Sequence, residues 1–591
     1  MVKHKTKKSP QKQKKSYRTG HGGLKHKKRF NWKRNIFIVL AVALVGGFAV
    51  YRSFAGNQVT IPSEFIARTY TEGLGRVPTQ TEWNKWHSYF QTRPCNTLSL
   101  SGTLAEVYFS DEYKNLPYSA DARTFTIYRG VLSREPDSGG FAYWKRRIET
   151  GTSIQTVLSS MAQSSEFKRL AGVICGSNNY PVKGVPFKIT SETSGQEVQK
   201  RIDAARPGST VYLPKSQLIR LSEPLLIKRG VTLATQDSAG LSGRMAYANM
   251  ARTVASDSTA ITAAPVVVMP GGSLRNVWVD GRMWQRGTKE NGKNNIRVFP
   301  TASTATVQHV RTENTTGAQN VMVFGIVGNE YTRGTGRDYL SDVYCSGTVN
   351  VTGNLVINSA NLRTSDKWSD GIATSCPQTQ ITSNDVLDAS DVGIITYRSY
   401  GALPQRSQIV GNNIINAGSS VFGGLVADPL SLRSQQMQPY PDCMKHESST
   451  EPHCDFTGLS FRDNTLWSGP DQYYAIGVSV GTRAWSFFKP DAVTGSGASF
   501  TNNSNRGSVI NVLIPLYVSG MHNATVTNNF THGKVTNRTQ TVTKCAPSAV
   551  QLYNPTFASN LNPTNQLRAI TESNPKFIAP VTTATDRDKC I

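Results

Sequence analysis

The sequence predicts a mainly β protein, a parallel β-solenoid that follows a transmembrane helix and a small all-α domain. Asp370-Gly371 and Asp391-Val392-Gly393 lie 21 positions apart, which is about the length of one solenoid coil. Short β-type runs that end in asparagine recur through the second half of the chain. The third observation is a strongly basic N-terminus that precedes a single apolar stretch.

The N-terminal region predicts a single-pass protein of the cell membrane. Residues 1–35 hold 14 Lys and Arg and no acid, within a formal net charge of +26 for 591 residues. We expect a disordered basic tail there. Residues 36–55 read as a transmembrane signal anchor, because 36–51 are almost wholly apolar and ~20 residues span a bilayer.

The positive flank precedes this apolar stretch, so the tail should be cytoplasmic and the later domains extracellular. A cleaved signal peptide is the alternative, although no clear cleavage site follows the stretch. The basic tail carries no aromatic or folded partner motif, so nucleic acid is not expected as a partner.

Cysteine usage also indicates export. All eight cysteines follow the apolar stretch, and no C-x-x-C pair occurs, which favours disulfides over a zinc site. The simplest pairing joins neighbours in sequence, with Cys443–Cys454 closing an insertion loop, although sequence alone does not fix connectivity. The disulfide candidates are Cys95, Cys175, Cys345, Cys376, Cys443, Cys454, Cys545 and Cys590.

Residues 60–176 contain an internal repeat of helical character. Apolar residues at helical spacing occur between the shared motifs, and each copy ends in a Ser-x-Glu-aromatic or closely related element. The matching positions are Tyr70, Leu74, Arg76, Pro78 and Trp86 in one copy, and Tyr128, Leu132, Arg134, Pro136 and Trp144 in the other. These motifs resemble the bacterial domain-of-unknown-function 4214 family, small helical modules found on exported and surface proteins.

Residues 177–196 read as a polar linker, and residues 197–560 as the solenoid. An amphipathic segment at 198–205 is followed by Pro207-Gly208 and then by β-type runs at 210–214 and 225–227. This order resembles the N-terminal cap of the pectate-lyase-like right-handed parallel β-helices. A capping helix would cover the exposed edge of the first coil.

The later coils read as short strands that end in asparagine, which tolerates the left-handed turn geometry. Residues 429–456 interrupt the rhythm as an insertion loop, and 561–591 read as a C-terminal tail.

The candidate site lies where coils stack. We align Asp370, Asp391 and Phe422 in one column, and the two carboxylates could act as acid and base. Asp388 is a further catalytic candidate beside this pair. Lys367 or Arg398 could serve as a base or charge stabiliser in β-elimination of an acidic sugar. The substrate-binding candidates on nearby turns are Trp368, Tyr397 and Asp428.

Other interpretations of these aspartates remain open. The Asp370–Asp391 stack, with Asp388, could bind Ca²⁺ through oxygen ligands, although no cofactor is certain. Asp before Gly is also common in turns, where the carboxylate accepts backbone N–H bonds.

The two aspartate motifs also resemble those of polygalacturonases. Asp370-Gly371 matches the end of that family's Asn-Thr-Asp-Gly motif, and Asp391 matches the second aspartate of its Asp-Asp pair. Phe422-Gly423-Gly424 replaces the family's Gly-His-Gly, and no Arg-Ile-Lys occurs. The resemblance therefore implies roles for Asp370 and Asp391 alone.

We expect a membrane-anchored surface protein that acts on polysaccharide as a glycoside hydrolase or polysaccharide lyase. The alternative is a non-catalytic glycan-binding or adhesive surface protein. The surroundings of Asp370 and Asp391 discriminate between the two functions.

Overall fold

The chain is described by a computed structural model. The described residues are 61–177, 180, 183–236, 243–255, 264–283, 294–299, 303–327, 343–359, 368–399, 403–429, 454–472, 474–481, 495–503, 510–518, 521–522, 524–527, 529, 535–536 and 550–552.

Eight helices form the helical module, four from each copy of the repeat. Polar caps such as Thr79, Asn96, Ser119 and Asp137 accept a backbone N–H of the first turn, which satisfies donors that a helix start leaves unpaired. The helices are α2 Ser63–Gly73, α3 Gln80–Thr92, α4 Thr97–Tyr108, α5 Asp111–Asn115, α6 Ala120–Leu132, α7 Ser138–Glu149, α8 Ile154–Ala162 and α9 Ser165–Ser177.

The repeated motif arginine has the same structural role in both copies. Arg76 donates two hydrogen bonds to Glu112, and Arg134 does the same to Glu166. Each guanidinium also lies over the motif tyrosine, 5.5 Å from the ring of Tyr70 and 5.1 Å from that of Tyr128. The motif therefore ties the first loop of each copy to its trailing Ser-x-Glu-aromatic element.

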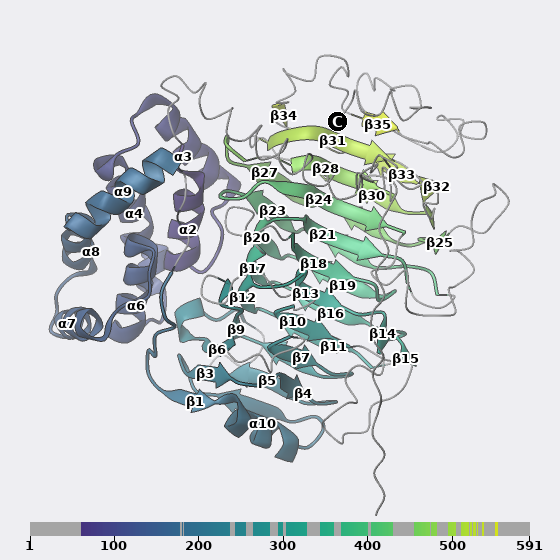
Figure 1. The fold of residues 1–591 in the computed structure, drawn as a ribbon, viewed down its shortest axis with the longest axis horizontal. Coiled ribbons are helices and arrows are strands. Elements are labelled where there is room, and N and C mark those ends of the chain that lie inside the picture. Colours follow the sequence, from purple (N-terminus) through teal and green to yellow (C-terminus); the bar gives the residue numbers. More distant parts are fainter. Residues whose placement is uncertain are drawn as a thin grey trace, which may run out of the picture. The chain divides into compact units, whose positions relative to one another are not determined.

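Three parallel sheets form the solenoid, and from β2 to β28 each coil contributes a strand to every sheet in turn (Figure 1). The nine-stranded sheet contains β1 Glu192–Ser194, β3 Leu218–Leu221, β6 Ala251–Ala255, β9 Val277–Asp280, β12 Arg311–Thr315, β17 Leu355–Ser359, β20 Asp385–Ala389, β23 Asn413–Asn416 and β27 Thr465–Ser468. The ten-stranded sheet contains β2 Thr210–Leu213, β5 Thr232–Thr235, β8 Ser273–Arg275, β11 Ala305–Gln308, β16 Val349–Thr352, β19 Thr379–Thr382, β22 Gln408–Val410, β26 Ser460–Arg462, β30 Ser499–Thr501 and β33 Thr525–Thr527.

The eleven-stranded sheet carries the candidate site. Its strands are β4 Leu225–Ile227, β7 Val266–Val268, β10 Ile296–Val298, β13 Gln319–Val323, β18 Asp370–Thr374, β21 Val392–Tyr397, β24 Val421–Asp428, β28 Tyr474–Val480, β31 Ile510–Val518, β34 Val535–Thr536 and β35 Val550–Leu552. Smaller elements are the 3-10 helix η1 Tyr247–Asn249, the antiparallel pair β14 Ile326–Val327 and β15 Val343–Tyr344, and a sheet of β25 Cys454–Asp455, β29 Gly495–Ser496 and β32 Met521–His522. The predicted parallel β-helix is confirmed by this strand order.

An asparagine ladder marks the turn from the ten-stranded to the nine-stranded sheet. The side chain of Asn384 donates to Asn412 Oδ1 at 2.9 Å, and Asn412 donates to Asn464 at the same distance. The buried rungs are Asn354, Asn384, Asn412, Asn464, Asn503 and Asn529. Each rung also bonds a neighbouring carbonyl, so the turn's buried polar groups are satisfied.

The capping helix α10 Gly195–Ala204 closes the first coil, as the sequence predicts. Its apolar residues Val198 and Ile202 belong to the solenoid core, together with Leu221 and Leu225 of the first strands. The core inside the coils consists mainly of Val, Ile and Leu, which suits strands buried on both faces.

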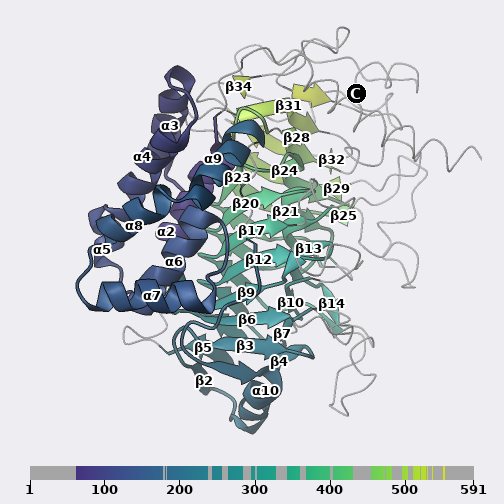
Figure 2. The ribbon, with the colours of Figure 1, turned by 60° about the vertical axis from the view of Figure 1, so that its left-hand side comes forward.

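The outer face of the nine-stranded sheet carries the helical module, and both lie within one compact unit (Figures 1 and 2). Arg129 of α6 donates to Glu72 of α2 at 2.8 Å and to Glu313 of β12 at 2.9 Å. Arg311 of β12 donates to the carbonyl of Thr71 at 2.9 Å. Module and solenoid are therefore joined by buried, charge-assisted hydrogen bonds.

We name this group the interface cluster. Its members are Arg68, Glu72, Arg129, Glu135, Arg252, Asp280, Arg311 and Glu313, all buried. The ring of Trp278 lies among three of the guanidinium groups, with centroid distances of 4.0 Å to Arg252, 4.8 Å to Arg129 and 5.1 Å to Arg311. Four acids and four arginines balance in charge, and the indole covers them with apolar surface.

The predicted membrane topology is corrected by the structure. No helix among the described residues is long and apolar enough to cross a membrane. The longest described helices have 13 residues, short of the ~20 that a bilayer requires. The basic tail 1–35 and the predicted anchor 36–55 lie outside the described residues. The transmembrane helix and the single-pass membrane location are therefore not supported.

Candidate functional site on the eleven-stranded sheet

The strand register differs from our alignment of the two aspartates. Asp370 lies opposite Gln319 on one side, and the pairing of Ile372 with Ile394 places it beside Val392 on the other. Val392 pairs with Gly423, so Asp391 lies beside Phe422. Asp370 and Asp391 are thus one position out of register, and the single column that we predicted is wrong.

A bulge between β20 and β21 nevertheless brings the two carboxyl groups together. The amides of Ser390 and Asp391 both donate to the carbonyl of Ser369, at 3.2 and 3.0 Å, so two residues face one. Such a bulge redirects the side chain that follows it. The carboxylate of Asp391 then lies close enough to Asp370 to raise the pKa of the latter.

A ladder of glycines lies in the strands beside the site. A Cβ on Gly371 would lie 2.5 Å from the carbonyl oxygen of Gly393, and one on Gly393 would lie 2.7 Å from that of Gly424. A Cβ on Gly424 would likewise lie 2.5 Å from the carbonyl oxygen of Gly477. The coils approach each other here as only glycine allows.

Three carboxylates gather on this face of the sheet, and we name Asp370, Asp391 and Asp428 the carboxylate cluster. Asp370 and Asp428 are 2% and 3% exposed, whereas Asp391 is partly accessible. Burial first, and then the charge of Asp391, raise the pKa of Asp370 well above its ordinary value, against the opposing hydrogen bond from Gln319. The surroundings of Asp370 therefore favour its protonated form more than those of an exposed aspartate would.

The pKa of the more accessible Asp391 is raised less than that of Asp370. Burial and the charge of Asp428 raise the pKa of its carboxyl to about 6, so it is mostly ionised at neutral pH. The phenol of Tyr397 faces Asp370, and burial together with the carboxylate cluster raises its pKa. Environments that separate the titration of neighbouring acids are typical of acid–base sites.

Two aromatic rings lie beside the accessible acid. The rings of Trp368 and Phe422 meet at 6.0 Å in an edge-on arrangement, and Phe422 is the neighbour of Asp391 in the sheet. Trp368 is 43% exposed, which is unusual for so large an apolar side chain. A flat apolar surface next to carboxylates is a common feature of ligand sites.

The structure places the remaining candidates differently. Arg398 follows β21, is buried, and its amide donates to the carbonyl of Asp428 at 3.2 Å, so it lies at the same end of the sheet as Tyr397. Lys367 lies outside the described residues.

Asp388 lies apart from the cluster, on β20 of the nine-stranded sheet. Its Oδ1 accepts the amides of Ala417, Gly418 and Ser419 at 2.7 to 3.2 Å. Burial, and then the charge of Glu64 in α2, raise its pKa to about 6. Its position facing the helical module assigns it to the fold rather than to the cluster.

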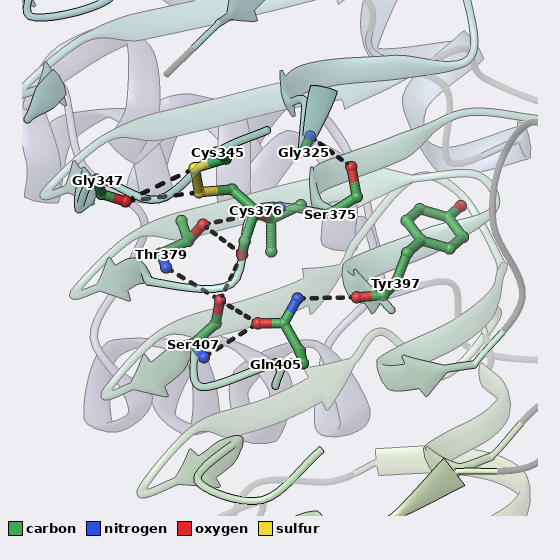
Figure 3. The surroundings of a disulfide bond; sticks show 10 residues. Gly325, Cys345, Gly347, Ser375, Cys376, Thr379, Tyr397, Gln405 and Ser407 are labelled. Carbon is green, nitrogen blue, oxygen red and sulfur yellow. Dashed lines mark hydrogen bonds between the residues drawn. A yellow bond between two sulfur atoms is a disulfide. The ribbon is translucent and has the colours of Figure 1, made fainter. Parts of the chain in front are cut away.

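A disulfide braces the end of the site strands (Figure 3). Cys345 and Cys376 are bonded just beyond β15 and β18. Ser407 Oγ donates a hydrogen bond to the carbonyl of Cys376 at 3.1 Å and lies 2.7 Å from Gln405 Oε1. Gln405 Nε2 in turn donates to the carbonyl of Tyr397 at 2.8 Å. This network fixes the backbone that carries Tyr397.

Two of the predicted disulfides are confirmed, Cys95–Cys175 and Cys345–Cys376. Cys454 is also disulfide-bonded. The candidates Cys443, Cys545 and Cys590 lie outside the described residues. Disulfides of this kind are typical of proteins in oxidising compartments.

A metal site is not apparent in the part of the chain that the structure describes, where no three His, Cys, Asp or Glu side chains gather closely enough to hold an ion. The carboxylate cluster provides oxygen atoms of the type that Ca²⁺ prefers, so Ca²⁺ stays an untested prediction.

The sequence did not identify the residues of the preceding coils that form a hydrogen-bonded chain to Asp370. Gln319 begins β13 and donates to Asp370 Oδ2 at 3.3 Å, and Asn294 precedes β10 and donates to Gln319. Both lie in coils whose lengths differ from 21 residues, so their register to Asp370 was not visible. The signal that could have found them is the recurrence of an amide side chain at a strand start.

Known proteins resemble two parts of the chain. Residues 105–171 match the model of the family described as Domain of unknown function (DUF4214). The chain combines a parallel β-helix with a helical module that is similar to this family over those residues. The match runs from α4 into α9, which confirms the resemblance of the helical module. No curated protein matches the chain.

Solved structures match the chain at low identity and low TM-score. PfbA, a surface adhesin of Streptococcus pneumoniae, is 11% identical, with a TM-score of 0.33 over 61% of this chain and 85% of that one. DFA-IIIase from Arthrobacter chlorophenolicus A6, without its lid, is 13% identical, with a TM-score of 0.30 over 61% and 88%. The Dettilon tailspike protein gp208 is 13% identical, with a TM-score of 0.30 over 56% of this chain and 62% of its own.

Proposed function

We propose that this protein hydrolyses a polysaccharide through Asp370 and Asp391 on the outer face of the eleven-stranded sheet. The observation that carries the proposal is the carboxylate cluster, in which buried Asp370, with a pKa raised well above its ordinary value, lies beside the more accessible Asp391, with a pKa raised to about 6. Buried like charges destabilise a fold, and groups of this kind are found most often at functional sites. The cluster therefore points to chemistry.

Hydrolysis of a glycosidic bond requires this pair of protonation states. The carboxylic acid, Asp370, donates its proton to the oxygen of the leaving sugar as the glycosidic bond breaks. The carboxylate, Asp391, stabilises positive charge on the reacting ring or accepts a proton from the attacking water. The charge of Asp428 contributes to the raised pKa values of both acids, and Tyr397 lies beside Asp370.

The aromatic pair supplies a surface for a sugar ring. Trp368 is exposed beside Asp391, and the long face of a β-helix suits an extended polymer. Elimination is the alternative reaction, for which Lys367 or Arg398 would serve as the base or charge stabiliser.

A second function is favoured by one observation. The exposed ring of Trp368 alone would be enough for glycan binding without catalysis, as in an adhesive protein. In that case the acids would contribute hydrogen bonds, and their ionisation would affect affinity but produce no cleavage.

A glycan panel tests the proposal. Purified protein is incubated with neutral and acidic polysaccharides, and reducing ends, absorbance of unsaturated products and retained binding are measured together. We expect new reducing ends without unsaturated products, and a loss of at least a hundredfold in Asp391→Asn. The exposed acid variant Glu223→Gln serves as the control. Binding without cleavage in all variants would favour the adhesive function instead.

A further inference from the structure

A line of side-chain hydrogen bonds runs across three coils and ends at Asp370. Arg297 Nε donates to Asn294 Oδ1 at 2.6 Å, Asn294 Nδ2 donates to Gln319 Oε1 at 2.7 Å, and Gln319 Nε2 donates to Asp370 Oδ2 at 3.3 Å. Asn294 and Gln319 are 2% and 6% exposed. The guanidinium of Arg297 lies 5.2 Å from the ring centroid of Phe324, which helps to hold it in place.

The direction of this line is fixed by its first member. A guanidinium only donates hydrogen bonds, so the amide oxygen of Asn294 must face Arg297. The amide nitrogen of Asn294 then faces Gln319 and requires an acceptor there. The amide nitrogen of Gln319 is therefore left to face Asp370. Rotation of Asn294 by half a turn would lose its bond to Arg297, and rotation of Gln319 would place two amide N–H₂ groups against each other.

The consequence for Asp370 concerns the location of its proton. An amide N–H₂ cannot accept a hydrogen bond, so Oδ2 of Asp370 stays an acceptor in both protonation states. The other oxygen, Oδ1, is buried and has no hydrogen bond of good geometry to the described residues. The amide of Val392 and the phenol of Tyr397 lie beside the carboxyl group, and Asp391 and Asp428 are the neighbouring acids.

We propose that Gln319 is a positioning residue, held by Arg297 and Asn294, which keeps Oδ2 of Asp370 as an acceptor and so places the acid's proton on Oδ1. The inference rests on the proposed function for its purpose, because a directed proton is useful to a general acid. Bonds that point the same way also polarise one another and extend the influence of the Arg297 charge toward Asp370. A residue two coils away would thereby tune the acid without touching substrate.

The test uses infrared difference spectra of the purified full chain during a pH titration. The carbonyl band that disappears in Asp370→Asn is assigned to protonated Asp370. In Gln319→Met, which keeps side-chain length and removes the donor, this band should move to higher wavenumber because its carbonyl oxygen loses a hydrogen bond. Its titration midpoint should rise by about one pH unit, since the lost bond favoured the carboxylate.

Two further variants keep the test decisive. Asn294→Leu should shift the band in the same direction but less, because the Gln319 amide remains and only its orientation is released. Gln380→Leu on the ten-stranded sheet should leave the band unchanged and controls for general effects of the substitution. An unchanged Asp370 band in both Gln319→Met and Asn294→Leu, with unfolding still cooperative, would overturn the inference. A shifted band in a protein that cleaves no glycan would support the positioning role and contradict the proposed function.

Discussion

The interface cluster and the carboxylate cluster are both buried, but they differ in charge balance. Beneath the helical module, Glu72 is bonded to Arg129 and Arg311 at 2.8 and 2.5 Å, and the charges of these arginines hold its pKa well below the usual range against the effect of burial. On the eleven-stranded sheet, burial and then the neighbouring charge of Asp391 raise the pKa of Asp370.

The difference in charge balance distinguishes a cluster that holds the helical module on the solenoid from one that serves function. Opposite charges in the interface cluster pair with one another. Buried ion pairs of this kind are suited to fixing one position of the helical module on the solenoid. Gathered carboxylates contribute no such stability, because each one disfavours ionisation of the next. We therefore assign the interface cluster to the fold and the carboxylate cluster to activity.

The largest effect is expected from breaking the interface cluster. Arg129→Met should lower the free energy of unfolding by about 3–5 kcal/mol, because Glu72 and Glu313 lose a partner while still buried. Chemical denaturation measures this change. Lys114→Met removes an exposed ion pair with Asp111 and should stay within about 0.5 kcal/mol of the wild type. Equal effects of the two variants would mean that burial adds nothing to this network.

The clusters should also respond to pH in opposite directions. The pKa of Glu313 is lowered, by Arg311 first among its charged neighbours and against burial, so its stabilisation is present above pH ~4.3 and is lost as the pH falls. The pKa of Asp391 is raised to about 6, so its ionisation destabilises the fold as the pH rises from ~4 to about 6.

Denaturation at several pH values separates the two. Glu313→Gln should be less stable than the wild type at pH 7, with a gap that shrinks below pH ~4. Asp391→Asn should gain stability over the same range, on the order of 1–2 kcal/mol by pH 7. Parallel pH profiles for both variants would contradict the distinction between the clusters.

The smallest effect on stability is expected at the aromatic pair. Trp368→Ala removes a ring that is 43% exposed, so the free energy of unfolding should change by less than about 1 kcal/mol. Affinity for the substrate glycan should fall about tenfold or more, which isothermal titration measures. Trp86→Ala is the contrasting variant, because that ring is 4% exposed in the helical core and should cost about 3 kcal/mol or more. Full glycan affinity in Trp368→Ala would remove the ring from the site.

The sequence was sufficient for features that repeat. The helical module, the capping helix, the asparagine turns and two disulfides were predictable, because each leaves a local pattern such as the Arg76 and Arg134 motifs or neighbouring cysteines. The parallel β-helix followed from the same regularity, since every coil must satisfy the same turns.

Features that depend on register were not predictable. The bulge at Ser390 and Asp391 shifts the strand by one position, and no local sequence pattern predicts this bulge. Asp388 was misplaced for a related reason, since it lies three positions before Asp391 but a corner between two sheets intervenes. Gln319 became visible only when the strands of unequal coils were paired.

Asp370→Asn provides the most direct test of the account, with unfolding free energy and glycan cleavage measured on the same preparation at pH 7. We expect stability to be unchanged or higher, because an acid whose ionisation is disfavoured in the carboxylate cluster is replaced by a neutral amide of similar size. Cleavage should fall by at least a hundredfold. A destabilised protein that keeps full activity would show that Asp370 serves the fold, and would contradict the assignment of the carboxylate cluster to catalysis.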